Sequence, residues 1–132
     1  MIDKIEVRTP AHSCFVDITS QVERTVRQHK IEEGICWIFI PHTTAGITVN
    51  ENADPTVQAD ILQQLGRMVP WEGDYRHSEG NSAAHIKASL MGSCQTVLVS
   101  RGRLQLGTWQ GIYLAEFDGP RTRQVWVRLL AG

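Results

Sequence analysis

Three histidines lie in polar stretches of this sequence where they could bind a metal ion. His42 lies in "PHTTAGITVNEN" (41–52), His77 follows "YR", and His85 lies in "NSAAH". Three imidazoles with an open fourth position are one pattern of a catalytic zinc site. His77 and His85 are eight residues apart, whereas the HExxH motif places its two histidines four apart on one helix. The histidines therefore predict either a metal site assembled from distant segments or ordinary surface and core residues.

The stretch 41–52 also carries many other hydrogen-bonding groups. Thr43 and Thr44 have hydroxyls that can donate to phosphate oxygens, and Asn50 adds an amide. Glu51 could act as a metal ligand or as a general base. Polar groups left unsatisfied beside a core cost roughly 1 to 3 kcal/mol each, and a bound ligand would satisfy them. The alternative is that these residues cap an ordinary turn.

A third polar set lies in "GTWQGIYLAEFDGPR" (107–121), on or just after segments that otherwise resemble core strands. Arg121 can bind a substrate, since its guanidinium can hold a phosphate through two hydrogen bonds. Gln110 is a second candidate for substrate binding. Glu116 or Asp118 could bind a divalent cation or position a proton acceptor. The alternative for "DGPR" is a simple turn with an exposed arginine.

Two common kinds of site are excluded by the motifs that the sequence lacks. It contains neither GxxxxGK[ST] nor GxGxxG, so a phosphate-binding loop of those types is absent. It contains no GxSxG turn that would place a nucleophilic serine. The three cysteines are widely spaced, which is typical of a reducing compartment and predicts a cytoplasmic location.

The pattern of apolar residues predicts short strands interrupted by two or three helices. Ser20 and Glu23 have the spacing of a capping box and predict a helix over 20–29. "ICWIFI" (35–40) is typical of a strand buried on both faces. Asp54 and Pro55 can begin a second helix, whose apolar stripe is Val57, Ile61, Leu62, Leu65 and Val69. A third helix is predicted within 81–92, with Asn81 or Ser82 at its start and Gly92 at its end.

The last third of the chain is rich in predicted strands with hairpin-like spacing. Within "RQVWVRLL", Val125, Val127 and Leu129 alternate with more polar residues. Residues 1–132 therefore predict a single α+β domain with a mainly antiparallel, β-sandwich-like sheet and two to three helices.

The overall charge excludes some partners. Thirteen Lys and Arg against fourteen Asp and Glu leave a formal charge of −1, so no global field attracts nucleic acid. No apolar run approaches the roughly 18 to 20 residues of a membrane span. We therefore expect neither nucleic acid nor membrane as a partner, and any phosphate binding must be local.

Taken together, "HTTAGITVNEN", "YRH" followed by "NSAAHIKASLMG", and "LGTWQGIYLAEFDGPR" resemble the YjbQ family of secondary thiamine-phosphate synthases. The resemblance covers nearly the whole chain. It implies a sandwich-like homotrimer with polar clefts near subunit interfaces, and a site built on His42, His77 and His85 with Glu51, Asn81 and Gln110 nearby. Relatives often have an acidic residue where this chain has Ser78, so a role for that position does not carry over.

The leading hypothesis is that the protein joins a hydroxymethylpyrimidine pyrophosphate to a thiazole phosphate. The predicted catalytic residues are His42, Glu51 and His85, and the predicted metal ligands are His42, His77 and His85. The predicted substrate-binding residues are Thr43, Thr44, Asn50, Asn81, Lys87, Gln110, Glu116 and Arg121. The cofactor would be zinc at the histidines or magnesium arriving with a pyrophosphate substrate. The alternatives are a non-catalytic binder of a small phosphorylated metabolite and a metal-assisted hydrolase.

Overall fold

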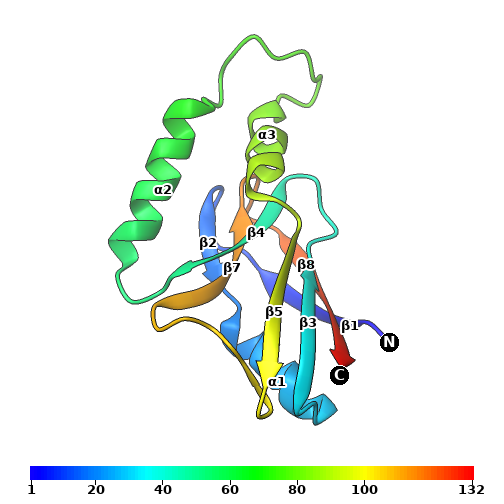
Figure 1. Ribbon diagram of the computed structural model, residues 1–132. Helices are drawn as coiled ribbons and strands as arrows, with labels where there is room; N and C mark the ends of the chain where they lie inside the picture. The colour runs from blue at the N-terminus through cyan, green and yellow to red at the C-terminus, as the bar shows by residue number, and fades with distance from the viewer.

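The computed structural model describes residues 1–132 as three helices and two antiparallel sheets in one domain (Figure 1). In chain order the elements are β1 (Asp3–Arg8), β2 (Cys14–Asp17), α1 (Thr19–His29), β3 (Glu33–Phe39), β4 (Ala45–Glu51), α2 (Pro55–Met68), α3 (Ser82–Met91), β5 (Cys94–Ser100), β6 (Arg103–Leu104), β7 (Gln110–Glu116) and β8 (Thr122–Ala131). One sheet has the strand order β1-β8-β3-β5-β6, and the other has the order β2-β7-β4. The predicted fold class is confirmed.

The main hydrophobic core lies between the two sheets and α1. Val22 and Val26 of α1 are fully buried there, together with Ile38 of β3, Ile112 of β7 and Val127 of β8. Each such side chain contributes about 1.5–3 kcal/mol when it is fully buried. The alternation of Val125 and Val127 in the sequence is therefore explained, because β8 turns one face to this core.

The helix predicted over 20–29 is confirmed by α1, but the predicted capping box does not form. The helix begins after Ile18, which has no capping side chain, and the Asp17 carboxylate accepts a hydrogen bond from the Thr19 N–H at 2.9 Å. The Glu23 carboxylate instead accepts a hydrogen bond from the backbone N–H of Leu104 at 3.3 Å. The capping box was wrong because a contact with β6 engages the carboxylate that the box requires, and the burial of Ile18 fixes the helix start.

The strand predicted to be buried on both faces is buried on only one. Along β3, Cys36 and Ile38 are fully buried, whereas Trp37 and Phe39 are each 42% exposed. The second sheet packs against one face of β3, and no helix of this chain covers the other. This uncovered face leaves an apolar surface on the five-stranded sheet.

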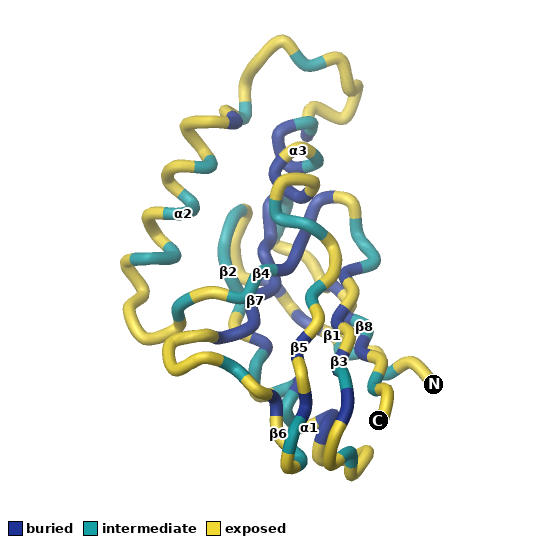
Figure 2. Tube along the Cα trace, viewed as in Figure 1, coloured by how far each residue is buried: buried dark blue, intermediate teal, exposed yellow.

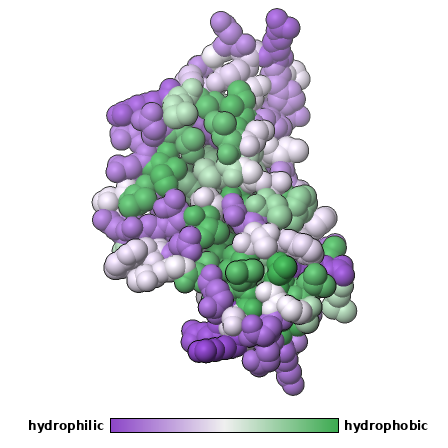
Figure 3. Space-filling view, in the orientation of Figure 1, coloured by the Kyte–Doolittle hydropathy of each residue, from purple (hydrophilic) through white to green (hydrophobic).

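The helices α2 and α3 have the ends that the sequence predicts, but they pack differently. Asp54 caps α2 and Pro55 is its first residue, while Gly92, with a φ of +92°, ends α3. No residue of α2 is buried, as Figure 2 shows for the whole helix. Within the helix the apolar stripe is only half-buried, and Val69, just after it, is buried. Figure 3 shows apolar side chains gathered along α2 on the side facing α3.

The elements meet at one corner of the molecule, and that corner positions the site. The β3–β4 loop (41–44), the start of α3, the end of β7 and the start of β8 converge there (Figure 1). α3 packs on β4 and β7 and holds this arrangement together. None of the three helices is both long and apolar enough to cross a membrane.

Candidate functional site

A polar cavity of about 480 Å³ lies at this corner, and no hydrophobic residue lines it. Its walls come from the β3–β4 loop, the loop before α3, the start of α3 and the β7–β8 turn. The lining residues are Pro41, His42, Thr43, Thr44, His77, Glu79, Asn81, His85, Asp118, Arg121 and Arg123. Binding cavities are usually lined mostly by apolar residues. A wholly polar lining favours a small, strongly polar ligand.

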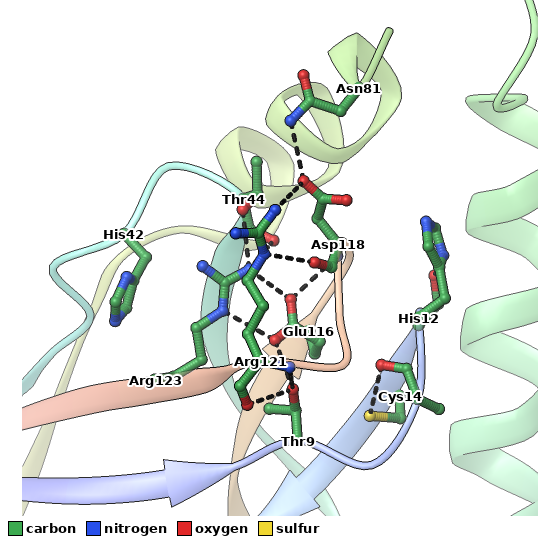
Figure 4. A network of polar contacts seen from close by, with 12 residues as sticks. Thr9, His12, Cys14, His42, Thr44, Asn81, Glu116, Asp118, Arg121 and Arg123 are labelled. Atoms are coloured by element: carbon green, nitrogen blue, oxygen red, sulfur yellow. Dashed lines mark hydrogen bonds and ion pairs between the residues drawn. The ribbon is translucent and has the colours of Figure 1, made fainter. Parts of the chain in front are cut away.

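A buried ion pair forms the floor of the cavity and joins the two sheets. Glu116 of β7 is fully buried and Arg123 of β8 is 4% exposed. Two nitrogens of Arg123, Nε and Nη2, donate to the two carboxylate oxygens of Glu116. The Thr9 hydroxyl and the Asp118 backbone N–H also donate to this carboxylate, at 2.8 and 3.0 Å. Figure 4 shows the resulting network.

The hydrogen bonds of this network determine the ionisation of Glu116. Burial alone would raise the pKa of its carboxyl group, because a charge is poorly solvated in the interior. The donors on Arg123, Asp118 and Thr9 outweigh burial, so the pKa is lowered from its ordinary value. Glu116 is therefore a carboxylate that accepts hydrogen bonds in the native protein.

Arg123 also fixes the β3–β4 loop. Its Nη2 donates to the Thr44 hydroxyl at 2.8 Å and to the Thr44 carbonyl at 3.4 Å. The remaining nitrogen, Nη1, has no protein acceptor within hydrogen-bonding distance. It is not among the atoms buried without a partner, so it is accessible from the cavity. Figure 4 shows this nitrogen on the side of the guanidinium that faces His42.

His42 is held in one protonation state by the backbone. The Gln124 N–H donates to His42 Nε2 at 2.9 Å, so Nε2 must carry a lone pair and Nδ1 must carry the proton. Burial lowers the pKa of His42, and the neighbouring Arg123 lowers it further. The ring is therefore neutral at pH 7, and its Nδ1–H has no acceptor within the protein.

The opposite wall is built on Asp118. Arg121 donates to the Asp118 carbonyl at 2.7 Å and to its carboxylate at 3.1 Å. The Asn81 amide nitrogen donates to the same carboxylate at 2.9 Å, at the start of α3. Asn81 therefore bonds to the β7–β8 turn through its side chain and does not cap its own helix with it.

His77 and His85 lie beside each other with ring centroids 5.3 Å apart, and His77 is 4.0 Å from a carboxylate oxygen of Glu79. No three or more His, Cys, Asp or Glu side chains are grouped so that they could hold a metal ion. The Nε2 lone pair of His42 already accepts the Gln124 N–H. The three predicted ligands line one cavity, but their present arrangement does not fit a three-histidine metal site.

The structure brings many of the predicted site residues together. Those that line the cavity are His42, Thr43, Thr44, His77, Asn81, His85 and Arg121. Glu116 was predicted to bind substrate. It lies beneath the cavity instead, where its carboxylate accepts hydrogen bonds from Arg123. Lys87 is buried on α3 and does not line this cavity.

Three other predicted residues lie at the far end of the three-stranded sheet. Glu51 pairs with Gln110, and Asn50 pairs with Gly111. β4 runs away from the cavity from Ala45, so these residues lie about 20 Å from it along an extended strand. The Gln110 side chain accepts a hydrogen bond from the Gly107 N–H at 2.7 Å. The stretch 41–52 is therefore not a single wall of the cavity.

The sequence-based reasoning missed Arg123 and Thr9. Arg123 shares the inward-facing positions of β8 with Val125 and Val127, and all three are buried. A charged residue in a row of inward-facing positions requires a buried partner, which is a signal that the sequence contains. Thr9 has no comparable signal, because its role depends on contacts more than one hundred residues away.

Comparisons with known proteins agree along the whole chain. The family described as UPF0047 protein YjbQ-like matches residues 3–132. A UPF0047 protein of Methanocaldococcus jannaschii is 47% identical over 98% of this chain and 94% of its own. YugU, a UPF0047 protein of Bacillus subtilis, is 48% identical over 98% of this chain and 99% of its own. A solved YjbQ/UPF0047 structure from Clostridium acetobutylicum is 52% identical, with a TM-score of 0.95 over 97% of this chain and 99% of that chain.

Proposed function

The chain belongs to the YjbQ-like UPF0047 family, and we propose that its polar cavity binds a small phosphorylated molecule as the substrate of a transferase. The observation that supports this proposal best is the wholly polar cavity, in which imidazoles, threonine hydroxyls and guanidinium groups meet. The best named reaction is the synthesis of thiamine phosphate from a hydroxymethylpyrimidine pyrophosphate and a thiazole phosphate.

This reaction makes modest demands on the protein. The thiazole nitrogen bonds to the methylene carbon of the pyrimidine while the carbon–oxygen bond to pyrophosphate breaks, and the electron pair leaves with pyrophosphate. No proton has to be removed from the attacking nitrogen. The protein must hold the two substrates in line and stabilise the negative charge on the departing oxygen. Donors such as His42 and Thr44 suit the second task, and His85 is placed to orient a ring.

We assign no step of this reaction to a metal ion, because the histidines do not form a metal site as they stand. Magnesium arriving with the pyrophosphate substrate stays a prediction. Asn50, Glu51, Gln110 and Lys87 take no part in the proposed reaction, because they do not line the cavity. A metal-assisted hydrolase would need the histidines as metal ligands, and their arrangement does not form a metal site.

The proposal is tested by supplying purified protein with both precursors and measuring thiamine phosphate. We expect product from the native protein and at least tenfold less from His42→Ala, since a hydrogen bond to a charged group is worth about 1.5–3 kcal/mol. Equal rates in the two proteins, or no product from the native protein, would reject this reaction.

A non-catalytic binder is the second candidate. It is supported by the same polar lining, since imidazole, hydroxyl and guanidinium donors can hold a phosphorylated molecule without carrying out a reaction. Calorimetry with each precursor alone separates the candidates, because a pure binder gives saturable heat without any product.

We also propose that the protein self-associates as a homotrimer, as the family resemblance implies. The uncovered face of the five-stranded sheet supports self-association. Trp37, Phe39, Trp126 and Leu130 are among the residues that line an apolar hollow of about 330 Å³ on that face. Exposed apolar surface of this kind is typical of protein–protein contacts.

A further inference from the structure

Among the donors of the cavity that have no acceptor in the protein, three belong to neighbouring residues at its floor. They are His42 Nδ1–H, the Thr44 hydroxyl and Arg123 Nη1. Native proteins rarely leave such groups without a partner unless water or a ligand provides one. A ligand that offers hydrogen-bond acceptors would therefore suit this part of the cavity.

The Thr44 hydroxyl is a donor because of its neighbour. Its oxygen accepts a hydrogen bond from Arg123 Nη2 at 2.8 Å, so its own hydrogen must point elsewhere. No protein atom accepts that hydrogen. Thr44 is 6% exposed, and the side chain is therefore fixed with its remaining donor available to the cavity.

His42 is a donor for a similar reason. The Gln124 N–H engages Nε2, and a backbone N–H cannot become an acceptor. Nδ1 therefore keeps its proton as long as this hydrogen bond persists. In this state neither ring nitrogen offers a lone pair to a metal ion, so the side chain can serve only as a donor.

Arg123 supplies the third donor and the charge. Its bond to Glu116 uses Nε and Nη2, which leaves Nη1 with both of its hydrogens free. Nη1 is not a buried atom although Arg123 as a whole is, so its hydrogens face the cavity, where water or a ligand can accept them. Arg121 also donates through Nε and Nη2, to the carbonyl and the carboxylate of Asp118, but its side chain is 53% exposed, whereas that of Arg123 is 5% exposed and fixed in place.

We infer that His42, Thr44 and Arg123 form a fixed donor wall that binds one phosphoryl oxygen directly, and that Arg123 rather than Arg121 is the phosphate-binding arginine. This inference rests on the proposed function, because it names the part of the same cavity that receives the phosphate. A wall of donors alone attracts an oxyanion and offers nothing to a cation. The phosphoryl oxygen would therefore contact the protein without a metal ion at His42.

The tautomer of His42 is tested by nitrogen NMR on protein labelled with ¹⁵N-histidine, at about pH 7.5, well above the ordinary pKa of imidazole. We expect a protonated Nδ1 and an unprotonated Nε2, with the Nδ1–H signal moving when inorganic phosphate is added. Added zinc should leave the His42 signals in place. A proton on Nε2, or zinc binding at His42, would overturn the inference.

The donor wall is tested by calorimetric or NMR titration of variants with inorganic phosphate and with pyrophosphate. Thr44→Val removes one donor and keeps the Glu116–Arg123 pair, so we expect binding at least about tenfold weaker. Thr48→Val, a matched change farther along β4, should bind as the native protein does. Arg121→Gln should weaken binding by less than about threefold, because its charge is exposed to solvent, screened, and already paired with Asp118.

Two results would overturn the inference on binding. One is an Arg121→Gln variant that loses binding while Thr44→Val keeps it. The other is native protein that binds neither anion. A thermal melt of each variant confirms that it is folded. Failure of the thiamine-phosphate assay leaves these binding results intact, so the donor wall and the proposed reaction can fail separately.

Discussion

Glu116 and Arg123 are the residues on which the cavity depends most. The structure predicts that Glu116→Gln destabilises the protein strongly, because it leaves the Arg123 charge buried with only neutral partners. Removing one member of a buried ion pair costs roughly 3–5 kcal/mol. Urea unfolding should show a loss of this size, whereas Glu6→Gln on the exposed side of β1 should change stability little. A loss in Glu116→Gln no larger than in Glu6→Gln would mean that the pair is not buried as described.

The lowered pKa of His42 predicts that the protein loses stability as the pH falls below 6.5. Its pKa in the folded protein lies below the ordinary value of 6.5, because of burial and Arg123. The folded state therefore resists protonation more than the unfolded state does. The contribution of His42 is fully present above pH 6.5 and is lost as the pH falls through the folded pKa. Glu116 opposes the lowering of this pKa, and Arg121 adds to it.

Urea unfolding of the native protein and of His42→Gln at several pH values tests this dependence. The native protein should lose more stability than the variant as the pH falls below 6.5, since only the native protein carries the imidazole. The loss from Glu116 begins lower, below the ordinary value of 4.5 for a glutamate. Parallel curves for the two proteins above that value would contradict the assigned state of His42.

At the scale of elements, the close approach of α3 to β4 holds the cavity together. A Cβ added to Gly46 would lie 2.7 Å from the Gly92 carbonyl oxygen, and that oxygen accepts the Ile47 N–H at 3.0 Å. Gly46→Ala should therefore destabilise the protein by about 1–3 kcal/mol, as overpacking does. Gly66→Ala, on the open side of α2 with no atom within 4 Å, should stabilise it by roughly 0.5–1 kcal/mol. Thermal unfolding measures both, and a neutral Gly46→Ala would contradict this packing.

The helices also show how far the sequence can be interpreted. Asp54, Pro55 and Gly92 act within a few residues of themselves, so helix ends set by them were predictable. The capping box at Ser20 failed because Glu23 binds a strand eighty residues away. Likewise, the polar run 41–52 was expected to be one wall, but its last residues follow β4 to the far end of the sheet. Contacts of that range have no local signal in a single sequence.

At the scale of the whole molecule, the uncovered face of the five-stranded sheet exposes several large apolar side chains to solvent. Trp37→Glu places a charge in the centre of this apolar face. We expect the variant to shift from trimer to monomer in light scattering, because a charge is costly in a buried interface. Met68→Glu, at an exposed apolar position on α2 outside this face, is the control and should keep the trimer. A native protein that is monomeric would reject the proposed trimer.

The two sheets and α3 meet at one corner, and we propose that the ligand binds there and not at the opposite end of the β4–β7 pair. Backbone amide NMR during titration with the pyrimidine pyrophosphate and the thiazole phosphate tests this most directly. We predict shifts at residues 42–44, at Asn81 and at residues 118–124, with Asn50, Glu51 and Gln110 unchanged. Shifts confined to Asn50, Glu51 and Gln110, or no shifts at all, would contradict the account.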